Sequence, residues 1–198
     1  MQCYGVEIRR PLLLLLIPIV VATGLVVLPL SVLAAVTGSG PLVADQTTGT
    51  APTGTQPTGT WPTGKPPSAF AVGDIPPAML ALYLAAGPYC PGLPWSVLAA
   101  IGRIESDHNR NPGVSSAGAR GPMQFLPSTW AEYGIDGDGD GVADIMDPAD
   151  AIPSAARYLC ANGGGQPATL PAAIWNYNHD ASYVALVLAT AVSYESAP

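Results

Sequence analysis

Basic residues are scarce in this sequence of 198 residues, and their scarcity argues against a nucleic-acid partner. Lysine and arginine number 7 against 14 aspartates and glutamates, which gives a net charge of −7. The imbalance grows after residue 69, where four arginines face twelve acidic residues. Because a phosphate backbone is bound through clusters of Lys and Arg side chains, we expect no nucleic acid to bind here.

Histidine and cysteine are also rare, and this argues against a zinc site. The chain has 2 histidines, 3 cysteines and no Cys-x-x-Cys motif, whereas a structural zinc ion needs four ligands of these types. Cys90 and Cys160 are the two cysteines of the C-terminal region. Two cysteines in a small exported domain usually pair. We therefore expect a disulfide between them, with two buried thiols as the alternative.

Strand-like alternation of apolar and polar residues is missing from the C-terminal region, so we expect a mainly α fold there. Proline and glycine mark helix starts and stops, as in the stretch from Pro76-Pro77 to Gly87-Pro88. These signals predict one compact domain over residues 70–198, with helices near residues 78–86, 94–105, 127–130, 148–162, 171–175 and 182–194.

The N-terminal segment, residues 1–36, is apolar enough to enter a membrane. No charged residue occurs between Arg10 and Asp45, and the run 12–36 could span a hydrocarbon core of about 30 Å. Arg9 and Arg10 precede the run, so the N-terminus is expected in the cytoplasm and the rest of the chain outside. We favour a membrane anchor; a signal peptide cleaved near Val32-Leu33-Ala34 is the alternative.

Residues 37–69 form a linker rich in proline, glycine and threonine. A Pro-Thr-Gly motif recurs at 52–54, 57–59 and 62–64. Such a composition offers little apolar surface to bury, so we expect a disordered spacer that holds the domain away from the bilayer.

One acidic residue is predicted on an apolar helix face. At 100° per residue, Glu105 shares a face of the helix 94–105 with Val97 and Ile101. A carboxyl group packed against apolar side chains is desolvated and its pKa rises, as in a general acid of a glycosidase. The alternative is a frayed helix end at which Glu105 reaches water.

Three ordered motifs then suggest a family. Glu105-Ser106, the run 121–125 (Gly-Pro-Met-Gln-Phe) and the run 176–178 (Asn-Tyr-Asn) resemble the motifs of lytic transglycosylases with a lysozyme-like fold. The resemblance covers roughly residues 94–194 and is closest to the membrane-bound, calcium-loop branch. Pro122 and the pair His179-Asp180 depart from the pattern of many relatives.

The resemblance implies a reaction and roles for its residues. The substrate would be the β-1,4 bond between N-acetylmuramic acid (MurNAc) and N-acetylglucosamine (GlcNAc) in peptidoglycan glycan strands, and the product a 1,6-anhydromuramyl end. Glu105 would be both acid and base. The sugar would be bound by Ser106, Met123, Gln124, Phe125, Tyr177 and Asn178. A hydrolytic muramidase and a non-catalytic, calcium-dependent wall-binding module are the alternatives.

An Asp-rich loop over residues 136–147 matches the spacing of a twelve-residue calcium loop. Gly141 occupies its sixth position, and oxygen ligands in this number suit calcium. We expect a structural calcium ion, with a solvated acidic turn as the alternative. The predicted ligands are Asp136, Asp138, Asp140, the Val142 carbonyl, Asp144 and Asp147.

Overall fold

The computed structural model describes residues 61–195, and within this range the chain is helical. An isolated β-bridge joins Arg120 to Phe125. The expectation of a mainly α domain is therefore confirmed. The apolar segment 1–36 and most of the linker lie outside the described residues. Between residues 61 and 195, no helix combines the length and the hydropathy needed to cross a membrane.

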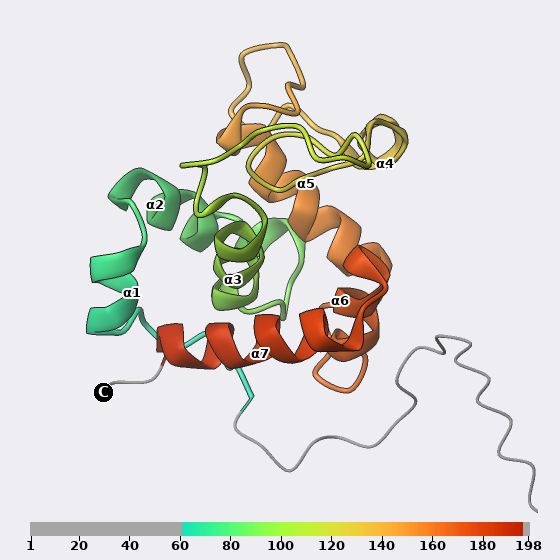
Figure 1. Cartoon of the computed structure of the whole chain (residues 1–198). Coiled ribbons are helices and arrows are strands. Elements are labelled where there is room, and N and C mark those ends of the chain that lie inside the picture. The colour runs from blue at the N-terminus through green and yellow to red at the C-terminus, as the bar shows by residue number, and fades with distance from the viewer. Residues whose placement is uncertain (1–60, 196–198) are drawn as a thin grey trace, which may run out of the picture. The chain divides into compact units, whose positions relative to one another are not determined.

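The helices follow one another with short connections, except around an extended region between α3 and α5 (Figure 1). In chain order they are α1 (Ala69–Asp74), α2 (Pro77–Ala85), the 3-10 turn η1 (Gly87–Tyr89), α3 (Trp95–Ser106), α4 (Pro127–Tyr133), α5 (Pro148–Ala161), α6 (Leu170–Asn178) and α7 (Ala181–Glu195).

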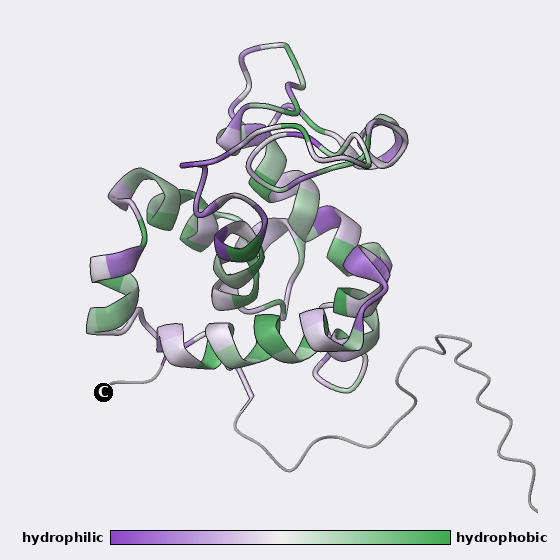
Figure 2. Cartoon of the chain, in the orientation of Figure 1, coloured by the Kyte–Doolittle hydropathy of each residue, from purple (hydrophilic) through white to green (hydrophobic). Residues whose placement is uncertain are grey.

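Helix α3 forms the centre of the core, where it packs against α7, α2 and α5 (Figure 1). Val97, Leu98 and Ile101 are fully or almost fully buried, as the apolar periodicity predicted. Each such side chain contributes about 1.5–3 kcal/mol by leaving water. Figure 2 shows hydrophobic residues over much of α2 and hydrophilic residues where the chain leaves α3. The core therefore fixes the position of the last turn of α3.

Every helix predicted from proline and glycine signals is present, and α1 is an addition. Ser68 caps α1 by accepting a hydrogen bond from the Ala71 amide. The helix has six residues and includes Gly73, so it is too short to show a helical period in the sequence. Ser68 also donates its own amide to the carbonyl of Tyr194 at 2.8 Å, which ties α1 to α7.

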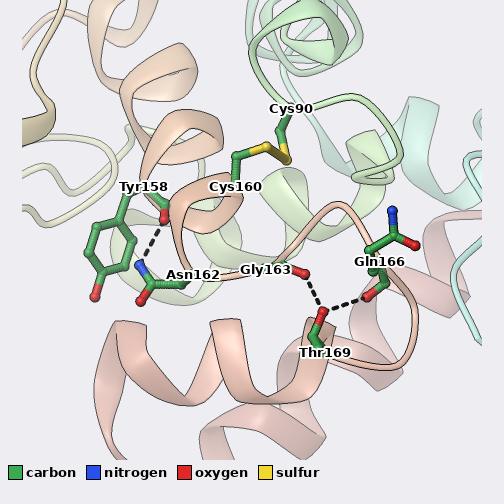
Figure 3. Close-up of a disulfide and its surroundings, with 7 residues drawn as sticks. All are labelled: Cys90, Tyr158, Cys160, Asn162, Gly163, Gln166 and Thr169. Atoms are coloured by element: carbon green, nitrogen blue, oxygen red, sulfur yellow. Dashed lines mark hydrogen bonds between the residues drawn. A yellow bond between two sulfur atoms is a disulfide. The ribbon is translucent and has the colours of Figure 1, made fainter.

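A disulfide between Cys90 and Cys160 joins the segment before α3 to the end of α5 (Figure 3). The two Cα atoms are 5.2 Å apart. The chain on either side is packed closely, because a Cβ atom on Gly92 would lie 2.3 Å from the carbonyl oxygen of Gly165. The turn after the bridge is closed by Thr169, whose hydroxyl donates to the Gly163 carbonyl at 2.5 Å. The bridge thus ties the segment before α3 to the end of α5, just before the turn that leads into α6.

Candidate active site

Glu105 lies in the last turn of α3 and lines an open cavity of about 350 Å³. Among the described residues that line this cavity, Glu105 alone carries a carboxyl group. The other lining residues are Ser115, Ala117, Ala119, Gln124, Leu126, Tyr177, Asn178 and His179. The structure therefore brings the predicted acid together with the predicted residues Gln124, Tyr177 and Asn178.

The carboxyl group of Glu105 is half-buried and hydrogen-bonded on one oxygen. Burial raises the pKa of Glu105 above its ordinary value, while a hydrogen bond from Tyr183 opposes that rise. The Tyr183 hydroxyl donates to Oε1 at 2.6 Å. Burial and the neighbouring carboxyl group raise the pKa of Tyr183 itself, so its phenol keeps the proton that it donates. Burial thus favours the protonated form of Glu105 more than it would for an exposed carboxyl group.

Tyr183 was not singled out in the sequence, although it is the direct partner of Glu105. It lies 78 residues away, in the first turn of α7. Tyr183 is buried, as are the nearby Val184 and Val187. An aromatic residue among such apolar neighbours is typical of a core position. The one available signal is chemical, because a buried tyrosine hydroxyl usually has a hydrogen-bond partner.

The turn after Glu105 is held by Ser106 and by three left-handed residues. Asp107, His108 and Asn109 have φ angles of 52°, 54° and 64°, a conformation that is uncommon outside glycine. The buried Ser106 hydroxyl donates to the Pro122 carbonyl at 2.7 Å and accepts from the Asn109 amide at 2.9 Å. Ser106 therefore positions the end of α3 and does not line the cavity.

A buried polar network lies behind this turn and was also missed in the sequence. The Nδ1 atom of His108 is 3.2 Å from the Tyr83 hydroxyl, and its Nε2 is 3.0 Å from the Tyr194 hydroxyl. Tyr194 also donates to Asp74 at 2.6 Å. Desolvation lowers the pKa of His108, against the opposing effect of Asp74. Gly102 is required here, since a Cβ atom there would lie 2.0 Å from the Tyr83 hydroxyl oxygen.

The Gly121–Phe125 segment contributes Gln124 to the cavity lining. A Cβ atom on Gly121 would lie 2.0 Å from the Ile145 carbonyl oxygen, so only glycine fits there. Gln124 has a φ of 48°. Its side-chain amide nitrogen donates to the carbonyl of Gly113 at 2.8 Å and to the carbonyl of Gly121 at 2.9 Å. With both of its donors used in this way, its amide oxygen is left as the group that can accept from a ligand.

Met123 and Phe125 are placed in the core rather than beside Glu105. Met123 is fully buried and does not line the cavity; its carbonyl accepts a hydrogen bond from the Tyr177 hydroxyl at 2.8 Å. Phe125 packs against Trp130, with ring centroids 5.4 Å apart. It contributes to a smaller adjoining cavity of about 170 Å³, which shares Gln124 and Tyr177 with the first.

Asn178 is the last residue of α6 and His179 is its C-cap, and both line the cavity. Both are exposed, and His179 has a φ of 56°, which ends the helix. Its imidazole packs edge-on against Trp175, with centroids 4.5 Å apart. The sequence marked His179 only as a departure from the family pattern. The structure places it on the lining of both cavities.

The Asp-rich loop brings together a set of carboxylates that differs from the predicted one. Oxygens of Asp136, Asp138 and Asp150 lie within 4.8 Å of one another. Asp147 instead caps α5 by accepting from the Ala149 amide at 2.7 Å. Asp140 accepts from the amide of Val142 at 2.8 Å, which is a local turn contact.

Asp150 was missed because the twelve-position count stops at residue 147. It is 2% exposed, and its two carboxylate oxygens accept from the amides of Gly137 at 2.7 Å and Asp144 at 2.8 Å. It therefore closes the base of the loop. A proline in the first turn of a helix and an aspartate before it are a typical helix start. That pattern already favoured a capping role for Asp147.

Comparison with known proteins finds a family match in the central part of the chain. Residues 95–172 match the family described as "Transglycosylase SLT domain". Residues 95–172 are therefore similar to a transglycosylase SLT domain. The matched range holds Glu105, the Gly121–Phe125 segment and the Asp-rich loop, whereas Asn178 and Tyr183 lie beyond it.

A curated relative of the SLT domain is the membrane-bound lytic murein transglycosylase B of Escherichia coli strain K12. It is 44% identical over 63 residues, which cover 32% of this chain and 18% of that protein. The aligned segment thus spans less than a fifth of the relative.

Two solved structures from Pseudomonas aeruginosa share the fold of the SLT domain. The soluble lytic transglycosylase SltB1 is 18% identical, with a TM-score of 0.51 over 70% of this chain and 85% of its own. SltB3, solved in complex with NAG-anhNAM-pentapeptide, is also 18% identical, with a TM-score of 0.51 over 71% of this chain and 69% of its own.

Proposed function

We propose that this chain is a peptidoglycan lytic transglycosylase. It cleaves the β-1,4 bond between MurNAc and GlcNAc and leaves a 1,6-anhydromuramyl end. One observation carries this proposal. Glu105 is half-buried and hydrogen-bonded to Tyr183, and it is the one carboxyl group among the described residues that line the cavity. It lies within the range that matches the SLT domain family. The 44% identity to a named lytic murein transglycosylase supports the same substrate.

In the first step Glu105 acts as a general acid. Its proton moves to the glycosidic oxygen, the bond from that oxygen to C1 of MurNAc breaks, and GlcNAc leaves as an alcohol. The raised pKa of Glu105 favours the protonated form that this step consumes. Tyr183 binds Oε1, so the proton to be donated belongs on Oε2.

In the second step the same carboxylate acts as a base. It removes the proton from the 6-hydroxyl of MurNAc, and that oxygen bonds to C1 to close the anhydro ring. The proton is thus returned to Glu105, and no water is consumed. Glycosidases that use water generally employ two carboxyl groups. Among the described residues that line the cavity, Glu105 is the single one with a carboxyl group. This favours the intramolecular route over a hydrolytic muramidase.

The remaining predicted residues divide into those that would touch the sugar and those that would hold them in place. Gln124 and Asn178 line the cavity with polar groups that suit an oxocarbenium-like sugar. The hydroxyl of Tyr177 is already bound to the Met123 carbonyl, so we assign the face of its ring to the contact with the sugar. We assign Ser106 and Met123 to positioning, and Phe125 to support of the adjoining cavity.

We further propose that the Asp-rich loop binds calcium, as a structural ion. Asp136, Asp138 and Asp150 present three carboxylate oxygens within 4.8 Å of one another, which suits ligand distances of about 2.3–2.6 Å to one ion. The predicted ligands Asp140, the Val142 carbonyl and Asp144 lie on the same loop and could complete the set. Asp147 is better assigned to helix capping. The ion would stabilise the loop that contacts Gly121 and takes no part in proton transfer.

The proposed location is outside the cytoplasmic membrane. Residues 1–36 are proposed as a single anchor, or as a signal peptide whose removal releases the chain, and both routes export the domain to peptidoglycan. The acidic composition of the domain argues against nucleic acid as the partner.

Mass spectrometry of the muropeptides released from purified peptidoglycan tests the reaction. The proposal expects products that end in 1,6-anhydroMurNAc and are lighter by one water than hydrolytic products. Reducing ends would instead indicate a muramidase, and binding without any release would indicate a wall-binding module. The matched control is Glu105→Gln, which keeps the shape of the side chain but cannot transfer the proton.

A further inference from the structure

Glu195, the last residue of α7, holds a piece of the linker in a polar site on the domain. It is 8% exposed. Its carboxylate accepts hydrogen bonds from the Thr63 amide at 2.6 Å, the Thr63 hydroxyl at 3.2 Å and the Gly64 amide at 2.8 Å. A fourth comes from the Ser96 hydroxyl of α3 at 2.5 Å. The carboxylate is therefore saturated with donors, three of which belong to the linker.

The neighbouring residues extend this site on both sides. The indole of Trp95 donates to the Lys65 carbonyl at 2.8 Å. Pro62 is buried, and with Trp61 it lines a cavity of about 280 Å³ that is bounded on the domain side by Gly92, Pro94, Gly164, Pro167 and Leu170. Figure 1 shows the chain entering the domain beside α7. Residues 61–65 thus contact the domain without forming a helix or strand, although their composition resembles the rest of the linker.

The contacts select for a Pro-Thr-Gly sequence rather than for any linker peptide. The second residue supplies a hydroxyl as well as an amide. The third residue has a φ of 75°, which favours glycine, and it donates its amide to the same carboxylate. The first residue fills a buried position, where a proline ring fixes φ and needs no donor.

The same three residues occur upstream at intervals of five. Pro-Thr-Gly is found at 52–54 and 57–59 as well as at 62–64. The bound copy differs from the other two in the residue before it, which is Trp61 rather than Ala51 or Gln56. Trp61 contributes to the cavity beside the site, so it gives the bound copy an advantage that the motif itself does not.

We propose that Glu195, Ser96 and Trp95 form a binding site for the Pro-Thr-Gly motif, and that the site accepts the upstream copies as alternative ligands. Trp61 sets the preferred register at 62–64. Each shift to an earlier copy shortens the free tether by five residues, or at most about 18 Å. The site lies twelve residues along α7 from Tyr183, about 18 Å away, so docking fixes where the tether leaves without covering the cavity.

Amide hydrogen exchange on the full chain tests the proposal. In the wild type, the amides of Thr63 and Gly64 should exchange at least about tenfold more slowly than those of Thr58 and Gly59. Gly64→Pro removes one donor and cannot adopt the positive φ. The protection should then move to Thr58 and Gly59. The melting temperature should fall less than in a variant with Gly54, Gly59 and Gly64 all changed to Pro. No new protection at Thr58, together with equal melting of the two variants, would overturn the proposal.

A second variant avoids any damage to the bound copy. Trp61→Gln with Lys65→Thr makes residues 61–65 identical to residues 56–60. If the site reads the motif, Thr58 and Thr63 should then share protection at comparable levels. Protection that stays at Thr63 and Gly64 alone would show a fixed strap that belongs to one position in the chain, and the proposal would be wrong.

Discussion

Tyr183→Phe gives a sharp test of how the protein controls its acid. The substitution removes one hydroxyl and keeps the ring that packs in the core. The lost contact is the 2.6 Å hydrogen bond to Oε1 of Glu105. Hydrogen bonds to charged groups contribute about 1.5–3 kcal/mol. Since 1.4 kcal/mol corresponds to about a factor of ten, we expect murein cleavage to fall by roughly 10- to 100-fold.

The pH profile should separate this effect from a general loss of stability. Activity that depends on protonated Glu105 is lost as the pH rises through its pKa in the folded protein. The Tyr183 hydrogen bond lowers that pKa, while burial raises it. With the hydrogen bond removed, burial acts unopposed, so the alkaline limb of the profile should move to higher pH.

The assay is the initial rate of muropeptide release as a function of pH, with the melting temperature measured in parallel. Tyr89→Phe is the matched control, because Tyr89 is exposed and lies outside the cavity lining. Wild-type rates and an unmoved alkaline limb in Tyr183→Phe would refute the assigned role of Tyr183.

Three further predictions concern stability. Calcium at about a hundred times its dissociation constant should stabilise the wild type by roughly 2.7 kcal/mol; an equal melting temperature for wild type and Asp138→Ala in calcium and in chelator would contradict the site. The pKa of His108 is lower in the folded protein than in the unfolded chain, so acid protonates the unfolded chain at a higher pH. The free energy of unfolding should therefore decrease as the pH is lowered below about 6.5. This slope should be measured in a Glu105→Gln background, because the raised pKa of Glu105 acts in the opposite direction; a flat slope there would count against a neutral buried imidazole. Replacing both Cys90 and Cys160 by serine should cost about 2–4 kcal/mol in urea unfolding, and an unchanged midpoint would show that the bridge adds nothing.

Local patterns in the sequence were sufficient to predict α3 and the placement of its acid. Val97, Leu98 and Ile101 repeat at helical spacing, and the structure buries them as that spacing requires. Glu105 follows on the same face. Helix signals of this kind depend on residues within a few turns of one another, so they can be read without knowing the fold.

The residues that the sequence did not reveal act over long separations or at the edge of a pattern. Tyr183 reaches Glu105 only because α7 packs across α3. Asp150 closes the acidic loop from a position three residues beyond the twelve-position count. Glu195 binds Thr63 across 132 positions in the chain. The Tyr183–Glu105 and Glu195–Thr63 pairs have no short-range signature, since packing and not spacing brings them together.

Cleavage in oxygen-labelled water is the most direct test of the central claim, which is that Glu105 directs an internal hydroxyl to C1. The full chain and Glu105→Gln would each be incubated with purified peptidoglycan in heavy-oxygen water. The masses of the released muropeptides would then be measured by mass spectrometry. The wild type should release anhydro ends that contain no label, and Glu105→Gln should release none while keeping its melting temperature. Label incorporated at the new muramyl end, or turnover by the variant at the wild-type rate, would contradict the mechanism.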